Sequence, residues 1–353
     1  MSMTSVVYLA AGDAATRKGA VALGISELLV RRPGRLGIFR PVVLPGRADG
    51  LIETIKARFG LEHSATGVTY EAVHQDPERA IAEIEARYRV LAGQCDAVVI
   101  VGTDYTDVGA PTEFAFNAIV AARLGAPVLL VVNGLGRTAE QIASAVEMCR
   151  RELRREHAVE LGTVVTRADP RHMPAGRARL RRPDAEPPVF LMPEEPRLSA
   201  PTISDLMSAC QGHLLLGDER QLNREVSGLM IGAMSLPNIL ERLTEGVCVI
   251  MPADRAAGLL PGLIAAHGAT TFPALSGVIL SGGMELPDPV ARLFDGLVVH
   301  LPVIITEDDT FDTAVRLSAV EGRFSPSATG KNDLALRLFA AHVDGEELLR
   351  RVS

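Results

Sequence analysis

The sequence predicts an α/β protein with two successive domains, each built on a parallel sheet. Short β-rich runs alternate with helical patterns along most of the 353 residues, an order that produces a parallel sheet flanked by helices. Two of these runs, AVVIV at 97–101 and VLLVV at 128–132, are continuously apolar, as expected for strands buried on both faces. A chain of this length is too long for one ordinary core, so two domains are expected.

The first domain is expected to span residues 1–220. Ligands of such sheets bind where the strands end, and the loop that begins at Gly12 follows the first strand. In chain order, strands are predicted at 6–10, 35–40, 97–101, 128–132 and 159–166, with helices at 18–30, 76–91, 113–124 and 138–155.

Residues 167–201 interrupt this alternation with a stretch rich in proline and arginine. We interpret the stretch as a solvated surface loop that closes the first domain, followed by one short strand and the start of a helix. An anion-binding patch is the alternative, and its candidates are Arg177, Arg179, Arg181 and Arg182.

The second domain is expected to span residues 221–353 and to repeat the α/β alternation on a smaller scale. A C-terminal helix is predicted at 332–352, because its apolar residues fall mostly on one face. The other predicted elements are strands at 225–231, 247–251, 277–280 and 302–305, and helices at 236–243, 255–266, 289–294 and 310–317.

Composition excludes several classes of function. The net charge of −7 argues against nucleic acid or an anionic membrane as a partner. No apolar run reaches the roughly 18–20 residues that a membrane span needs, and no secretory signal is visible. The cysteines are far apart and form neither a metal motif nor a disulfide framework, which suits the reducing cytoplasm; they are Cys95, Cys149, Cys210 and Cys248. We expect no metal site and no cofactor.

The loop after the first strand is close to a phosphate-binding P-loop, G-x-x-x-x-G-K-[ST]. Residues 12–19 read G-D-A-A-T-R-K-G, so Gly12 and Lys18 are in register. Arg17 replaces the second glycine and brings a long side chain to a point where the backbone normally approaches a phosphate. Gly19 replaces the hydroxyl residue that holds Mg²⁺. Lys18 is expected to be solvated, so that its replacement by alanine would hardly affect folding.

A second metal contact is also missing. P-loop enzymes of the synthetase type carry an acid at the end of the strand that corresponds to 97–101, where this chain has Val101 and Gly102. Asp104 lies beyond the strand, and Asp96 lies at its opposite end. A degenerate loop that serves as scaffold is therefore favoured over a live ATPase. Anion binding by Gly12 and Lys18 without catalysis stays open.

Eight sequence blocks resemble one family, the long-form bacterial phosphate acetyltransferases. The resemblance covers nearly the whole chain and implies a dethiobiotin-synthetase-like domain followed by a DRTGG domain. The DRTGG motif reads D-R-A-A-G at 254–258, so two of its five letters differ. The blocks are RLGIFRPVVLPG (35–46), DAVVIVGTDYTD (96–107), FNAIVAARLGAPVLLVVNGLGRT (116–138), SAPTISDLMSACQGHLLLGD (199–218), EVSGLMIGAMSLPNILERL (225–243), MPADRAAGLL (251–260), ILSGGMEL (279–286) and LPVIITEDDTFDTA (301–314). Within the first block, FRP (39–41) resembles the "KP" that follows the second strand of the synthetases.

The resemblance implies the regulatory and assembly portion of these enzymes. The family's acetyl-transferring domain follows this region, and only ten residues remain after Val343, so we expect no catalytic residue here. The implied partners are a further copy of the chain or an acetyltransferase catalytic domain. Two alternatives are a stand-alone metabolite sensor that docks on a separate acetyltransferase, and an ATP-dependent ligase like dethiobiotin synthetase.

A small anionic metabolite is the expected effector, bound in the second domain. Two turns follow apolar strands there and should meet at the carboxyl edge of the sheet. An arginine fork and open glycine N–H groups would bind a carboxylate or phosphate; a helix cap and a plain turn are the alternative interpretation. The candidate residues are Asp254, Arg255, Ser281, Gly282 and Gly283.

Overall fold

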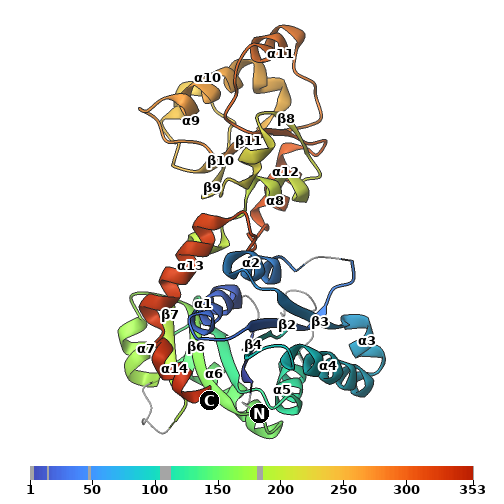
Figure 1. Ribbon diagram of the computed structural model, residues 1–353. Coiled ribbons are helices and arrows are strands. Elements are labelled where there is room, and N and C mark those ends of the chain that lie inside the picture. The colour runs from blue at the N-terminus through green and yellow to red at the C-terminus, as the bar shows by residue number, and fades with distance from the viewer. Residues whose placement is uncertain (1–3, 14–15, 47–48, 104–112, 181–185, 353) are drawn as a thin grey trace. The chain divides into compact units, whose positions relative to one another are not determined.

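The computed structural model describes residues 4–13, 16–46, 49–103, 113–180 and 186–352. The chain divides into two compact units (Figure 1). The first unit contains residues 1–195 together with 324–353, and the second contains residues 196–323. Each unit has its own sheet and its own buried core.

The sheet of the first unit has seven described strands in the order β3-β2-β4-β1-β5-β6-β7, with parallel neighbours throughout. The central strands are buried on both faces, which explains their continuously apolar sequences. The strands are β1 (Ser5–Ala11), β2 (Leu36–Val43), β3 (His63–Thr69), β4 (Ala97–Val101), β5 (Val128–Asn133), β6 (Glu160–Ala168) and β7 (Val189–Pro193).

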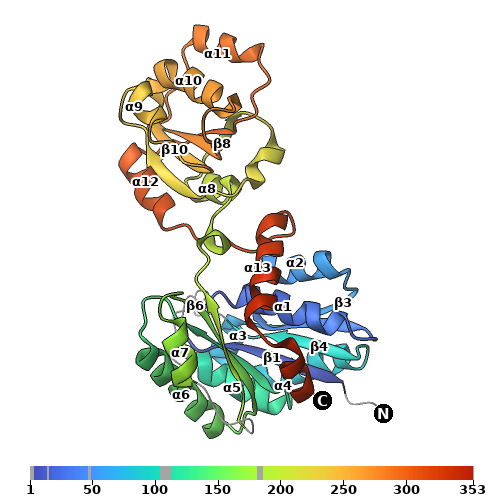
Figure 2. The ribbon, with the colours of Figure 1, turned by 90° about the vertical axis from the view of Figure 1, so that its left-hand side faces the viewer.

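Helices cover both faces of this sheet (Figures 1 and 2). Several begin at side chains that cap their free N–H groups: Asp49 caps α2, and Thr138 and Gln141 form a capping box on α6. The helices are α1 (Lys18–Val30), α2 (Gly50–Phe59), α3 (Tyr70–Gln75), α4 (Pro77–Ala92), α5 (Glu113–Arg123), α6 (Ala139–Arg155), α7 (Met173–Leu180), α13 (Thr329–His342) and α14 (Gly345–Arg351).

The C-terminal helices α13 and α14 belong to the first unit, contrary to the expected domain 221–353. They pack on α1, and the contact is close because glycines face large side chains: Gly24 faces the Phe339 ring, and Gly345 faces Leu28. Ten of the thirteen residues of α1 are consequently buried. The single helix expected at 332–352 is two helices, separated at Val343 and Asp344.

The second unit has a sheet of five described strands in the order β8-β12-β11-β10-β9. Its pairs are parallel except β8 with β12. The strands are β8 (His213–Leu216), β9 (Gly228–Ile231), β10 (Val247–Pro252), β11 (Gly277–Ser281) and β12 (Val303–Ile305). The helices are α8 (Ile203–Ala209), α9 (Leu236–Leu240), α10 (Ala256–Gly268), α11 (Asp288–Asp295) and α12 (Thr310–Ser318), with short 3-10 turns at Pro196–Ser199, Glu219–Asn223 and Ala253–Arg255.

The division between the units lies at Glu195 and Pro196 rather than at the expected 220/221. The physical reason is the packing of α8 and β8. β8 pairs with β12, and Ile203 and Leu206 of α8 are buried in one core with strand residues such as Ile250.

Sequence patterns missed four elements of the first unit: β3, α2, α3 and α7. The first four residues of β3 are partly or fully exposed, so its sequence, HSATGVT, lacks an apolar run. α7 lies in the stretch that was expected to be a loop. Of the arginines proposed there, Arg181 and Arg182 lie outside the described residues, and the side chains of Arg177 and Arg179 are not described. Among the described residues, no helix has both the length and the apolar character to cross a membrane.

Candidate functional site

The candidate site lies at the carboxyl edge of the first sheet, where β2, β4 and β1 end side by side. Because these strands are parallel neighbours, the loops that follow them share one edge, the usual ligand position of an open α/β sheet. The degenerate loop follows β1, and Gly102 and Thr103 follow β4.

Gly12 begins the loop, and its position requires glycine for space. A Cβ atom there would lie 2.7 Å from Sγ of the buried Cys149. The Gly12 N–H donates to the Val131 carbonyl at 2.8 Å. This N–H is therefore used within the sheet.

Arg17, which stands in place of the second glycine of a P-loop, has a backbone conformation that favours glycine. Its φ of 51° and ψ of 41° are left-handed, which costs a non-glycine residue roughly 1–2 kcal/mol. The chain thus turns sharply at Arg17, immediately before α1 begins.

Lys18 is buried, with only 2% of its surface exposed. Its Nζ donates to the carbonyl of Thr103 at 2.6 Å and to the carbonyl of Gly102. The expectation of a solvated lysine was therefore wrong. A buried ammonium group needs hydrogen-bond acceptors. The carbonyls of Gly102 and Thr103 can supply them because these residues lie beyond the end of β4.

Arg40, on β2, is a second buried cation at the same place. Its Nη1 donates to the carbonyls of Val101, at 3.2 Å, and Gly102, and its Nε lies 2.9 Å from Oδ2 of Asp49. The Gly102 carbonyl accordingly accepts from both Lys18 and Arg40. Sequence analysis did not name Arg40 as a site residue, although the FRP block contains it.

Gly19 has no room for the hydroxyl side chain of a P-loop. A Cβ atom at this position would lie 2.5 Å from Cδ2 and 2.6 Å from Cε2 of Phe324. Phe324 precedes α13, in the segment that returns to the first unit. An aromatic ring thus occupies the space beside the helix start where the metal-binding hydroxyl of a P-loop would lie.

Asn117, on α5, fixes the segment after β4. Its Oδ1 accepts from the Tyr8 hydroxyl at 2.7 Å and from the Thr103 N–H at 3.0 Å. Its Nδ2 donates to Oγ1 of Thr103 at 2.6 Å and to the Glu113 carbonyl at 3.0 Å. Burial raises the pKa of Tyr8 well above its ordinary value, so its hydroxyl keeps its proton. Asp104, the suggested substitute acid, lies outside the described residues.

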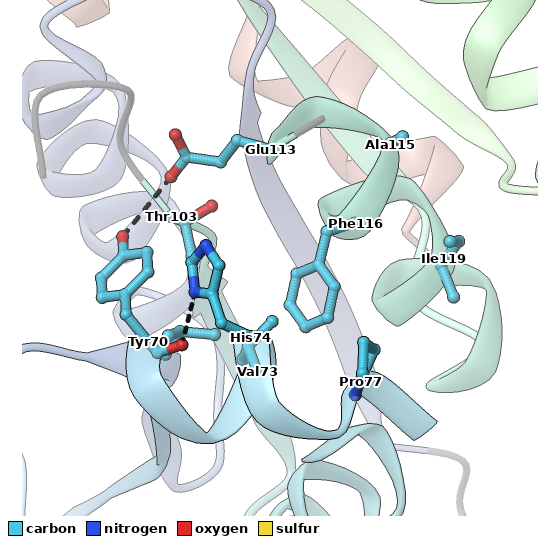
Figure 3. A pocket seen from close by; sticks show the side chains of 10 residues that line it. Tyr70, Val73, His74, Pro77, Thr103, Glu113, Ala115, Phe116 and Ile119 are labelled. Carbon is cyan, nitrogen blue, oxygen red and sulfur yellow. Dashed lines mark hydrogen bonds between the residues drawn. The ribbon is translucent and has the colours of Figure 1, made fainter. Parts of the chain in front are cut away.

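A pocket of about 360 Å³ opens beside this network (Figure 3). It is bounded by the end of β2, by α3 and by α5. Sequence analysis missed it because its walls come from separate parts of the chain. Its described lining residues are Val42, Tyr70, Val73, His74, Pro77, Thr103, Glu113, Ala115, Phe116 and Ile119.

In the second unit the two predicted turns do lie together, because Pro252 of β10 pairs with Ser281 of β11. The expectation of open N–H groups was wrong, however. Gly282 donates to the Asp308 carbonyl at 2.8 Å, and Gly283 donates to the Thr306 carbonyl at 3.0 Å. Both glycines have positive φ, 91° and 62°, as in a tight turn.

The side chains at these turns also have structural partners. Ser281 is fully buried, with its hydroxyl 2.7 Å from that of Thr310. Arg255 Nη1 donates to the Ala233 carbonyl. Asp254 is exposed, and no side-chain cap is present at the start of α10. The two turns share one edge, and Ser281, Gly282 and Gly283 bond within the second unit. Asp254 and Arg255 are exposed, and anion binding at this edge stays a prediction.

Comparison with known proteins agrees with this architecture. The AAA domain family matches residues 5–202, and the DRTGG domain family matches residues 205–320. The phosphate acetyltransferase of Nitratidesulfovibrio vulgaris is 31% identical over 372 residues, covering 99% of this chain and 52% of the relative. That of Synechocystis sp. is 28% identical, covering 98% of this chain and 52% of the relative. The chain thus spans about half the length of these curated relatives.

Solved structures match parts of the chain. MinD from Pyrococcus horikoshii, complexed with Mg-ADP, is 16% identical and covers 56% of this chain and 84% of its own, with a TM-score of 0.36. The CBS and DRTGG domains of Clostridium perfringens pyrophosphatase, complexed with the activator diadenosine tetraphosphate, are 15% identical. They cover 37% of this chain and 53% of their own, with a TM-score of 0.28.

The order of the two matched domains and the extent of the sequence matches agree with the sheet and the loop described above. The chain belongs to the AAA domain family, carries a DRTGG domain after it, and corresponds to the amino-terminal region of phosphate acetyltransferases.

Proposed function

We propose that this chain is the non-catalytic regulatory and assembly portion of a phosphate acetyltransferase. The reaction of the whole enzyme, acetyl-CoA plus phosphate to acetyl phosphate plus CoA, would take place on a separate catalytic domain. The family assignment and the half-length match to the relatives support this proposal. We place the chain in the reducing cytoplasm, because its four cysteines are free and buried.

The observation that carries the proposal is the state of the phosphate loop. A working loop needs a lysine that reaches the outer phosphates and a hydroxyl that holds Mg²⁺. Lys18 instead donates to the carbonyls of Gly102 and Thr103, and the Phe324 ring occupies the space beside Gly19. ATP-dependent ligase chemistry is disfavoured on the same grounds.

Assembly is supported by apolar side chains that the second unit exposes. Phe311 and Val315 lie one turn apart on α12 and are 74% and 53% exposed. Contiguous exposed apolar surface is a feature of protein interaction sites, and these two side chains are our candidate for the centre of such a surface. A lower mass of Phe311→Ser than of the unchanged chain, by light scattering, would identify α12 as part of the contact.

The direct test is enzymatic. The purified chain should convert no acetyl-CoA and phosphate to acetyl phosphate, and should hydrolyse no ATP, because chemistry requires positioned reactants and the loop cannot position them. Preparations from a host that lacks its own phosphate acetyltransferase exclude contaminating enzyme. Acetyl transfer by such a preparation would contradict the proposal. So would Mg²⁺-dependent ATP hydrolysis that disappears in Lys18→Ala.

A further inference from the structure

The pocket beside β4 has two chemically different ends. Figure 3 shows Tyr70, His74, Thr103 and Glu113 gathered at one end, and Phe116, Pro77 and Ile119 lining the other. Val42, Val73 and Ala115 complete the apolar wall. A pocket of about 360 Å³ is in the range that holds small molecules. Its location at the carboxyl edge of a parallel sheet is where such ligands bind.

The polar end is rich in hydrogen-bond acceptors. Glu113 is 6% exposed, and its Oε1 accepts from the Tyr70 hydroxyl at 3.4 Å. His74 Nδ1 lies 2.7 Å from the Tyr70 carbonyl. A carbonyl only accepts, so Nδ1 carries the hydrogen, and Nε2 of the neutral ring is left as an acceptor. In the described part of the chain, no hydrogen-bond partner of Nε2 is recorded.

The charged groups of the lining also favour a ligand that donates hydrogen bonds. Among the described lining residues there is a carboxyl group, on Glu113, but neither lysine nor arginine. A ligand carboxylate or phosphate at this end would contact the Glu113 carboxyl group directly, whereas the buried cations nearby, Lys18 and Arg40, already bond to the Thr103 and Gly102 carbonyls. A protonated amine would gain charge-assisted hydrogen bonds there.

We propose that this pocket is an effector site for a small molecule with an amine head and a compact apolar body. The amine donates to Glu113 and to Nε2 of His74, and the body packs against Phe116 and Ile119. The site lies in the first unit, and its ligand has the opposite charge from the anionic effector expected in the second unit. Binding at this site is independent of whether the chain has catalytic activity.

The chain contains no tryptophan, so an indole probe can be observed directly by its own fluorescence. Three probes share an indole ring and a two-carbon linker but differ in the head: tryptamine is an amine, tryptophol is an alcohol, and indole-3-propionate is a carboxylate. We expect tryptamine to bind at least about tenfold more tightly than indole-3-propionate, from the difference between a charge-assisted bond and a like-charge contact.

Variants of the full chain locate the site. Glu113→Gln should weaken tryptamine about tenfold and leave tryptophol nearly unchanged, while Phe116→Ala should weaken all three probes. Phe311→Ala is the matched control, because it removes the same ring from an exposed position in the second unit. Its affinities should equal those of the unchanged chain. If Glu113→Gln does not fold, His74→Phe removes one acceptor at an exposed position and should weaken tryptamine more than indole-3-propionate.

The proposal is overturned if indole-3-propionate binds as tightly as tryptamine. It is equally overturned if Phe116→Ala leaves tryptamine binding unchanged, or if no fluorescence change occurs at millimolar tryptamine. Because the readout is probe fluorescence, discovery of acetyl transfer in this chain would refute the proposed function and leave this result intact.

Discussion

At Gly19 the first unit lacks both the hydroxyl of a P-loop and the space to restore it. The missing hydroxyl is visible in the sequence, since Gly19 stands where a serine or threonine is needed. The Phe324 ring that fills the space is not, because the contact joins residues far apart in the chain. Sequence reasoning therefore identified the missing hydroxyl but not the ring that fills its place.

We predict that Gly19→Ala destabilises the first unit by about 1–2 kcal/mol, since overpacking against Phe324 outweighs the roughly 1 kcal/mol gain in helix propensity. In a chain that already carries Phe324→Ala, the same Gly19→Ala change should cost much less, because the ring that it clashes with is gone. Urea unfolding of the two single variants and the double variant measures this difference. Gly258→Ala, where a new Cβ would meet no atom within 4 Å, is the control and should be neutral or slightly stabilising. Equal effects at Gly19 and Gly258 would refute the clash.

Lys18→Ala should cost about 2–3 kcal/mol of unfolding free energy, because it removes charge-assisted bonds to the Gly102 and Thr103 carbonyls in a buried site. Lys56→Ala is the control, since this partly exposed lysine pairs with Glu53 on its own helix and should change stability by less than about 0.5 kcal/mol. Chemical denaturation measures both. Similar small values would mean that Lys18 is solvated after all.

Among the elements, α1 shows what a sequence pattern can reveal. Its residues 19–25 read GAVALGI, with no polar face, and a helix that is apolar all round is buried on all sides. This signal predicts a second layer over α1, but not that α13 and α14 supply it. Their assignment to the other domain followed from chain order alone, which cannot show that residues 324–353 return to the first unit.

Phe339→Ala should therefore destabilise the first unit and not the second. Its ring packs against Gly24 and is almost fully buried, and loss of a buried phenylalanine costs about 3–5 kcal/mol. Hydrogen exchange by mass spectrometry should show faster exchange in α1 and α13, with β10 and β11 unchanged. Phe294→Ala, which removes a buried ring from the second unit, should show the opposite distribution. Faster exchange in β10 after Phe339→Ala would contradict the assignment of α13.

At the scale of the whole molecule, the alternation of strands and helices correctly predicted an α/β fold with two sheets. The two strands that were missed, β3 and β8, lie at sheet edges and are partly exposed, but so are β7 and β9, which were found. β3 was missed because it lacks an apolar run, and β8 because it has only four residues. The pocket could not be predicted from the sequence either. Its polar end combines Tyr70, His74 and Glu113, which only the folded sheet brings together.

The four buried thiols predict how the stability of the whole chain depends on pH. Burial raises the pKa of Cys149 to about 12 and also raises the pKa of Cys95, Cys210 and Cys248. The native state therefore holds these protons more tightly than the unfolded chain, whose thiols titrate near about 8.5. The contribution of these thiols to the free energy of unfolding should be fully present below about pH 8.5. It should fall as the pH rises toward 12, by up to about 1.4 kcal/mol per pH unit for each thiol.

Urea unfolding between about pH 8 and pH 10.5 measures this dependence. Cys149→Ala lowers the stability at every pH but should make its decline with pH shallower, because one shifted thiol is gone. A parallel decline in the variant and the unchanged chain would show that Cys149 does not contribute.

The N–H of Gly322 donates to the Ser199 carbonyl at 2.9 Å, so the incoming and outgoing segments of the second unit lie side by side. Adjacent ends are the geometry that lets one domain be inserted into another without straining the host. Residues 196–323 therefore form an inserted domain that recombination can exchange for another domain with adjacent ends. After such an exchange, the residues that follow 323 would still pack over α1 and complete the first unit. Such an exchange would replace the second unit and leave the pocket beside β4 in place.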